Sequence, residues 1–150
     1  MALADNVPLA LANRFKVTVD APKYIDLGSW AKAEGLDVQF DVIEYRAGDS
    51  WNQRWFSPGA TKYVPIKLSR TVSAATKDVK KWLNETALKH VPGSMVIALF
   101  DASNTSVHEW EVRSAMPSKW SVGGFDAGAS KLAIETLEIV HLGFLDDDRN

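Results

Sequence analysis

Alternating apolar and polar residues predict a mainly β chain. The alternation in Phe15–Val19 is typical of a half-buried strand. Leu36–Val42 is the clearest case, with four apolar residues on one parity and three polar residues on the other. Lys62–Thr71 alternates in the same way, although Pro65 cannot donate to a ladder and predicts an edge or a bulge. We therefore expect Leu36–Tyr45 and Lys62–Thr71 to pair as a long hairpin with an extended connection.

The second half of the chain predicts one helix and further strands. Apolar residues between Val79 and Ala87 recur at helical spacing, and Pro92 with Gly93 ends the helix. Met95–Phe100 and Val107–Ser114 flank a turn and predict a second strand pair. Three segments without clear periodicity are expected to be connections: Asp20–Ala33, Arg46–Thr61 and Met116–Ala129. The expected fold is mainly β (α+β), with about six strands and one flanking α-helix.

The last expected strand, Lys131–Leu145, is apolar on both parities. Such a strand is unusual in a small domain, because one of its faces normally meets water. The helix or another subunit would cover the second face. The side chains considered for a contact between subunits are Leu137, Ile139, Leu142 and Phe144. We expect a single domain over residues 1–150, with a short N-terminal arm (1–12) and an acidic C-terminal tail (146–150).

Large aromatic side chains lie in the expected connection Arg46–Thr61, namely Trp51, Trp55 and Phe56. The surrounding glycine, proline, serine and asparagine residues favour a turn. An aromatic side chain left in water forfeits roughly 1.5–3 kcal/mol relative to burial. Three of them in one loop indicate that the loop docks onto something. It either folds back over the chain's own core or reaches a neighbouring subunit.

Composition excludes several classes of function. The 150 residues are 46% hydrophobic, carry a formal net charge of −2 and include no cysteine. The net charge disfavours nucleic-acid binding through a general basic field, and the lack of cysteine excludes disulfides and thiolate metal sites. No apolar run reaches the length of a membrane span, and the first residues lack the basic region of a signal peptide, so we expect folding in a cytoplasm.

The titratable residues do not form a recognisable catalytic or metal-binding pattern. His90, His108 and His141 are far apart and lack ligand spacing. Glu135 and Glu138 are three apart on an expected strand, so they point to opposite faces. We therefore expect no enzymatic activity, no metal and no cofactor.

Several segments resemble the tail-tube protein family of contractile phages, which includes the inner-tube proteins of phage-tail-like contractile injection systems. The matching segments are Gly35–Val38 running into Val42–Gly48, then Thr61–Tyr63 with Ile66–Arg70, Ala115–Trp120 and Ala133–Ile139. The most specific are Pro-Ser-Lys-Trp, ending at Trp120, and Ala-Ile-Glu-Thr-Leu-Glu, ending at Glu138. The similarity covers roughly Asn13 to Phe144, which is nearly the whole chain.

The resemblance implies a structural role. Members of the family have a β-barrel-like fold with one flanking helix, and the type VI secretion tube protein has a similar fold. Six subunits close into a ring, their strands join into a continuous inner barrel, and rings stack into a hollow tube. The implied partners are other copies of the chain, a sheath protein, baseplate and spike proteins, and cargo or a tape-measure protein in the lumen. Sheath contraction drives the tube through a target envelope.

Two features depart from the family pattern. The region after Tyr45 is usually more polar, so Trp51, Trp55 and Phe56 are unusual, and Pro65 interrupts the second strand. Because the family uses this region between rings, we expect Arg46–Thr61 to lie where stacked rings meet.

The polar parity of the two long strands predicts a hydrated bore. The apolar parity is expected to face the core, and it comprises Leu36, Val38, Phe40, Val42, Val64, Ile66 and Leu68. The opposite parity would line the lumen, and it comprises Asp37, Gln39, Asp41, Lys67 and Ser69. Alternatively, this polar face is simply the outer surface of the protein. The alternative functions are an initiator or baseplate-adaptor ring of the same machine and a monomeric carrier barrel for small molecules.

Overall fold

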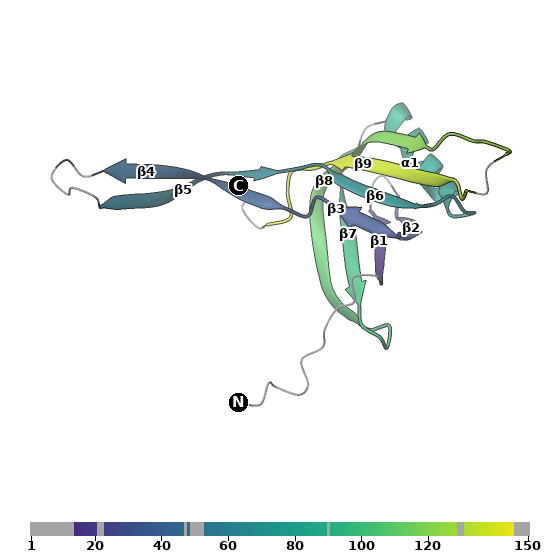
Figure 1. Cartoon of the computed structure of the whole chain (residues 1–150), viewed down its shortest axis with the longest axis horizontal. Helices are drawn as coiled ribbons and strands as arrows, with labels where there is room; N and C mark the ends of the chain where they lie inside the picture. The colour runs from purple at the N-terminus through teal and green to yellow at the C-terminus, as the bar shows by residue number, and fades with distance from the viewer. Residues whose placement is uncertain are drawn as a thin grey trace.

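The computed structural model describes residues 14–20, 23–46, 48, 53–89, 91–128 and 131–145. These residues form nine strands and one helix (Figure 1). In chain order they are β1 (Phe15–Val19), β2 (Ile25–Ser29), β3 (Lys32–Glu34), β4 (Val38–Arg46), β5 (Arg54–Tyr63), β6 (Ile66–Thr71), α1 (Thr76–Leu88), β7 (Gly93–Phe100), β8 (Ser106–Val122) and β9 (Ile134–Val140).

The mainly β fold with one helix is confirmed, with nine strands rather than about six. The expected connection Asp20–Ala33 contains β2 and most of β3, and Arg46–Thr61 contains most of β5. Both segments hold glycine or proline, which weakens the sequence signal of a strand without preventing strand formation at an edge. The expected arm and tail lie outside the described residues.

Seven strands form one antiparallel sheet in the order β2-β1-β7-β8-β9-β6-β3. The long strand β8 joins its two halves, because it pairs with β7 up to Ala115 and with β9 from Met116 onward. Ser114 lies just before this change of partner, where the β7–β8 register shifts, and its φ of 49° is a left-handed conformation that redirects the strand. The expected connection Met116–Ala129 is therefore wrong for its first half, since β9 supplies a partner as far as Val122.

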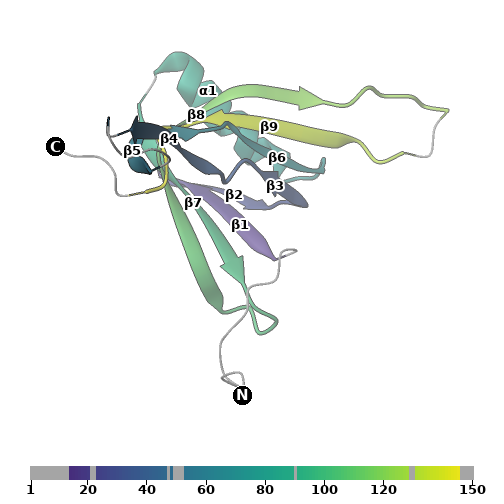
Figure 2. The same cartoon turned by 60° about the vertical axis from the view of Figure 1, so that its left-hand side comes forward.

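The halves of the sheet and the helix enclose one core (Figure 2). Inward side chains come from both halves, for example Val17 and Ile97 on one side and Leu68 and Leu137 on the other. The helix α1 packs against β2 and β8 and buries Val79 and Trp82. The interior is filled with side chains, which does not favour the carrier-barrel alternative.

A buried ion pair crosses the sheet beside this core. Arg70 on β6 lies directly opposite Glu135 on β9, and their side chains are 6% and 0% exposed. The Nε of Arg70 donates to Oε1 of Glu135 at 2.5 Å, and its Nη1 donates to the carbonyl of Leu27 at 2.6 Å. The guanidinium also lies 4.0 Å from the ring centroid of Trp30. The two family-like segments Ile66–Arg70 and Ala133–Ile139 therefore meet at this pair.

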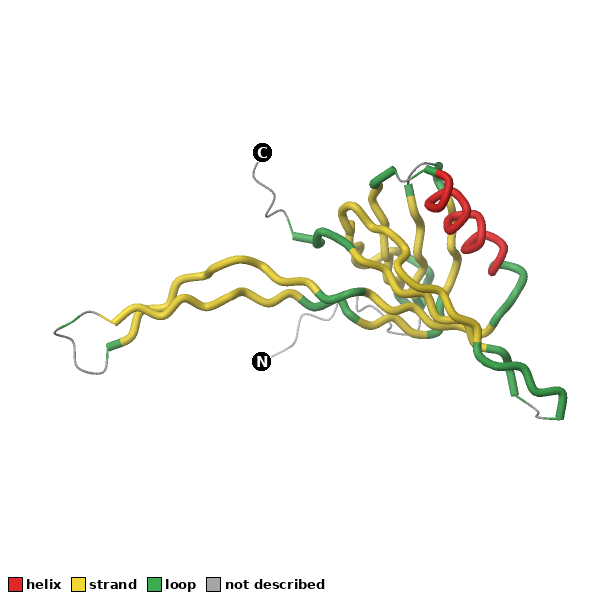
Figure 3. Tube along the Cα trace, turned by 90° about the horizontal axis from the view of Figure 1, so that it is seen from above, coloured by secondary structure: helices red, strands yellow, loops and turns green. Residues whose placement is uncertain are grey.

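The expected pairing of Leu36–Tyr45 with Lys62–Thr71 is wrong except at Lys62 and Tyr63, which lie opposite Gln39 and Val38. β4 pairs with β5, and these two strands form a separate sheet that projects from the domain (Figures 1 and 3). β6 instead lies between β3 and β9. The chain leaves the ladder at Val64 and Pro65, between the end of β5 and the start of β6. The prediction of an edge or a bulge at Pro65 thus corresponds to a break between two strands.

Candidate functional site

The β4–β5 hairpin exposes an apolar stripe on one of its faces. Cross-strand register places Val42 opposite Pro58, and Phe40 opposite Thr61, on this face. Phe56 extends the stripe toward the tip and is 68% exposed, while Val42 is 65% exposed. At the tip the stripe gives way to charged groups, where Glu44 lies 3.3 Å from the guanidinium of Arg54.

The other face of the hairpin changes character along its length. Tyr45 lies opposite Trp55 near the tip, and Ile43 follows on the same face. These three side chains are 55%, 59% and 43% exposed, respectively. Toward the base, Asp41 pairs with Lys62 at 2.9 Å on a polar surface. The outer half of the hairpin therefore exposes apolar side chains on both faces, beside the charged residues of its tip.

This exposure corrects two expectations. The reading in which the aromatic segment covers the chain's own core is wrong for Trp55 and Phe56, because both are exposed on a strand that leaves the domain. Trp51 lies outside the described residues. The expectation that the apolar parity of the two long strands faces the core is also wrong for Phe40, Val42 and Val64, which are exposed. Ile66 and Leu68 do lie in the core, at 0% exposure, because β6 is part of the main sheet.

The C-terminal segment holds the base of the hairpin in place. His141 accepts a hydrogen bond at Nδ1 from the amide of Gly143 at 3.0 Å, so its Nε2 carries the proton donated to the carbonyl of Val64 at 2.9 Å. Tyr63, the last residue of β5, makes edge-to-face contacts with His141 and Phe144 at centroid distances of 5.6 and 5.2 Å. Burial lowers the pKa of His141, and its bond to the Val64 carbonyl opposes this effect.

The residues considered for contacts between subunits on the last strand separate into two groups. Leu137 and Ile139 are 0% exposed, so their side chains belong to the subunit core and are not available to another chain. β9 spans only Ile134–Val140, and its outward parity includes Thr136 and Glu138, so the expected second apolar face depends largely on residues outside the strand, such as Leu132 and Leu142. Leu142 is 67% exposed, and Phe144 packs on Tyr63 of its own chain.

The outward face of the second half of the sheet is polar and regular. Cross-strand partners form a row of alternating charge: Glu34, Lys67, Glu138 and Lys119. The adjacent row is Lys32, Ser69, Thr136 and Ser121. Lys32 binds Glu34 at 2.6 Å, and this bond, aided by Lys67, lowers the pKa of Glu34. Of the lumen candidates, Lys67 and Ser69 lie on this face, whereas Gln39 and Asp41 lie on the hairpin and Asp37 just before it.

Two edges of this half-sheet are open. Among the described strands, β3 pairs only with β6, and the part of β8 from Met116 to Val122 pairs only with β9. Unpaired edges present rows of backbone donors and acceptors that favour pairing with another chain. The sequence did not reveal these edges, since β3 is a three-residue strand inside an expected connection.

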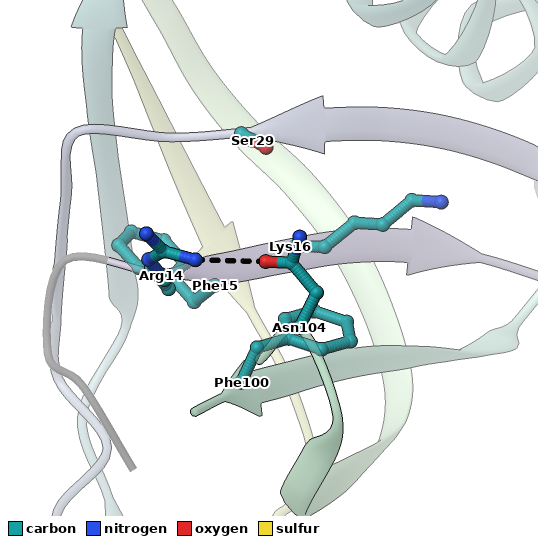
Figure 4. Close-up of a pocket in the computed structure, with 6 residues that line it drawn as sticks. All are labelled: Arg14, Phe15, Lys16, Ser29, Phe100 and Asn104. Atoms are coloured by element: carbon teal, nitrogen blue, oxygen red, sulfur yellow. Dashed lines mark hydrogen bonds between the residues drawn. The ribbon is translucent and has the colours of Figure 1, made fainter. Parts of the chain in front are cut away.

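A surface hollow of about 340 Å³ lies at the start of β1 (Figure 4). Its cations already have partners, because Arg14 donates to Asn104 at 2.9 Å and Lys16 binds Asp26 at 2.8 Å. Within the described ranges, no three His, Asp or Glu side chains gather closely enough to hold a metal ion. No helix in the described part of the chain is long and apolar enough to cross a bilayer.

Comparison with known proteins identifies the architecture. The sequence profile of the T4-like virus tail tube protein gp19 family matches residues 11–145. The chain belongs to this family. It is a structural subunit of the tube of a contractile tail or tail-like injection system. No curated protein sequence matches the chain.

Solved structures of tail-like particles contain chains similar to this tube subunit. A chain in the 6-fold symmetrised anti-feeding prophage baseplate has a TM-score of 0.72 at 22% identity, over 96% of this chain and 99% of that chain. A chain in the sheath-tube complex of the PVC extracellular contractile injection system has a TM-score of 0.69 at 24% identity, covering 93% and 89%. A chain in the anti-feeding prophage tube-terminating cap also has a TM-score of 0.69, at 27% identity, covering 93% and 89%.

Proposed function

We propose that six copies of this subunit close into a ring, and that rings stack into a hollow tube through the β4–β5 hairpin. The observation that carries the stacking proposal is the hairpin itself, whose outer half exposes apolar side chains on both faces. A two-stranded ribbon of this kind is marginally stable alone. Covering Trp55 and Phe56 in a neighbouring ring would recover roughly 1.5–3 kcal/mol for each fully buried side chain.

The ring closes by continuation of the half-sheet. Its four strands alternate in direction, from the second part of β8 through β9 and β6 to β3. An even number of alternating strands allows β3 of one copy to lie antiparallel to β8 of the next. This closure pairs both open edges, so the inner barrel of each ring has no unpaired strand edge.

The polar outward face of the half-sheet lines the bore in this arrangement. Its alternating charges give a hydrated wall that carries both signs, and cargo slides along such a wall because no strong field of one sign holds it. A sheath surrounds the tube, a baseplate and spike seat it, and contraction of the sheath propels it through an envelope. The similar chains belong to structures of a baseplate, a sheath-tube complex and a tube-terminating cap, which supports these partners.

The stacking proposal is tested with the double variant Trp55→Ala, Phe56→Ala. We expect an unchanged melting temperature, because both side chains are exposed in the subunit, together with loss of tubes in electron micrographs. Tyr24→Ala is the matched control, since Tyr24 is 67% exposed and lies beside β2 rather than on the hairpin. Normal tubes from the double variant would refute stacking through the hairpin.

The lumen is tested separately by single cysteine substitutions in a chain that has none of its own. Cysteines replacing Lys67 or Lys119, both in the alternating row of the half-sheet, should react with a bulky maleimide in free subunits and become protected in assembled tubes. A cysteine replacing Lys80, on the exposed side of α1, should react in both states. Equal labelling of Lys67→Cys before and after assembly would contradict the lumenal placement of this face.

A further inference from the structure

The end of the subunit opposite the hairpin carries a second exposed apolar surface. It consists of Phe125, Leu132 and Ile134, where β8 leads through a connection into β9, and we call it the β8–β9 end. These side chains are 83%, 76% and 50% exposed. A hollow of about 270 Å³ lies there between Phe125 and Leu132, with Ala127 and Ala133 in its wall.

The β8–β9 end and the hairpin lie at opposite ends of the longest axis of the molecule. Figure 1 shows the hairpin at the left and the connection between β8 and β9 at the right, and the view from above in Figure 3 agrees. A copy displaced along this axis therefore brings its hairpin toward the β8–β9 end of the first copy. Contacts between two different patches repeat without closing, and they generate linear stacks.

We infer that the β8–β9 end is the socket that receives the hairpin of a copy in the adjacent ring. The inference rests on the proposed function, because it names the receiving surface of that same stacking contact. The hairpin offers aromatic rings on a narrow ribbon, and the β8–β9 end offers a hollow with an apolar wall. Charges do not oppose the contact, since both surfaces carry both signs: Glu44, Arg46 and Arg54 at the hairpin tip, and Asp126 and Lys131 at the rim of the hollow.

The first test uses the socket variant Phe125→Ala, Leu132→Ala. Both side chains are more than half exposed, so the melting temperature should not change. The concentration needed for tube growth should rise by at least about tenfold, because apolar area that stacking would cover is lost. Leu88→Ala is the matched control, since Leu88 is 89% exposed at the end of α1 and should leave tube growth unchanged.

Tube growth by the socket variant and by the hairpin variant distinguishes docking at the β8–β9 end from stacking through the hairpin. If the socket variant grows normal tubes while Trp55→Ala, Phe56→Ala does not, the hairpin docks elsewhere and the socket is refuted. If both variants grow normal tubes, stacking through the hairpin fails as well. If neither grows tubes alone, a mixture of the two should form short stacks, because the intact hairpin of one fits the intact socket of the other. A mixture that gives only single rings would overturn the inference.

A cross-linking measurement tests the contact directly in assembled tubes. With Phe56→Cys and Leu132→Cys in one chain, oxidation should link copies into ladders on a denaturing gel without reducing agent. Phe56→Cys combined with Leu88→Cys should leave the chains separate. Ladders from the control pair, or none from the test pair in intact tubes, would refute the assigned socket.

Discussion

The buried pair Arg70–Glu135 gives the sharpest stability prediction. Glu135→Gln keeps the shape of the side chain and removes its charge, so the guanidinium of Arg70 stays buried without a counter-ion. Breaking a buried pair by removing one partner costs about 3–5 kcal/mol. A destabilisation of 1 kcal/mol lowers the melting temperature of a domain of this size by about 2–4 °C, so the expected decrease is about 6–20 °C.

The assay is thermal unfolding followed by circular dichroism on dilute subunits, because assembly would raise the apparent stability. Replacing both partners, with Arg70→Met and Glu135→Leu, should recover most of the loss, since no charge is then left buried. Glu34→Gln is the control, because it removes an exposed carboxylate paired with Lys32 and should leave the melting temperature nearly unchanged. A decrease of less than about 1 °C for Glu135→Gln would refute the reasoning.

Three further predictions concern the hairpin and its base. Burial lowers the pKa of His141 below its ordinary value of 6.5, so the unfolded chain binds the proton more tightly than the folded chain. The free energy of unfolding should therefore be level above pH 6.5 and decrease as the pH falls below 6.5. His141→Gln should remove this slope between pH 6.5 and 5 in urea titrations. Gly143→Ala should cost on the order of 1–3 kcal/mol in the same titrations, because φ is 118° and the added carbon would lie 2.4 Å from the ring of Tyr63. Gly59→Ala should abolish tube growth and leave the melting temperature unchanged, since its Cβ would lie 2.6 Å from the carbonyl oxygen of Asp41 in the hairpin. Gly48→Ala, with open space around it, should change neither tube growth nor the melting temperature.

Sequence patterns predicted the elements that bury one face. β1 and α1 follow their apolar periodicity closely, and Met95–Phe100 lies wholly within β7. β5 escaped prediction because Ser57, Pro58 and Gly59 favour turns, and a projecting ribbon has no core to impose an alternating pattern. A two-stranded ribbon tolerates proline where a central strand would not.

The candidate surfaces were predicted less completely, because they depend on strand pairing. The aromatic segment pointed to Trp55 and Phe56, whereas the β8–β9 end combines Phe125 from an expected connection with Leu132 and Ile134 from the expected strand Lys131–Leu145, and no sequence pattern joins these residues into one surface. Arg70 and Glu135 are 65 positions apart, and only the register of β6 against β9 brings them together. The pairing of β3, β6, β9 and β8 likewise aligns four separate charged residues into one alternating row: Glu34, Lys67, Glu138 and Lys119.

The hairpin has a consequence for how a cell controls the timing of construction. Its strands contribute no buried residue to the core, so the domain reaches its native state before any neighbour is present. Production of subunits and polymerisation are therefore separate steps, and finished subunits accumulate as a reservoir. In the proposed ring assembly, nucleation sets the length of the delay, because a first stable ring must form before subunits add to a growing tube.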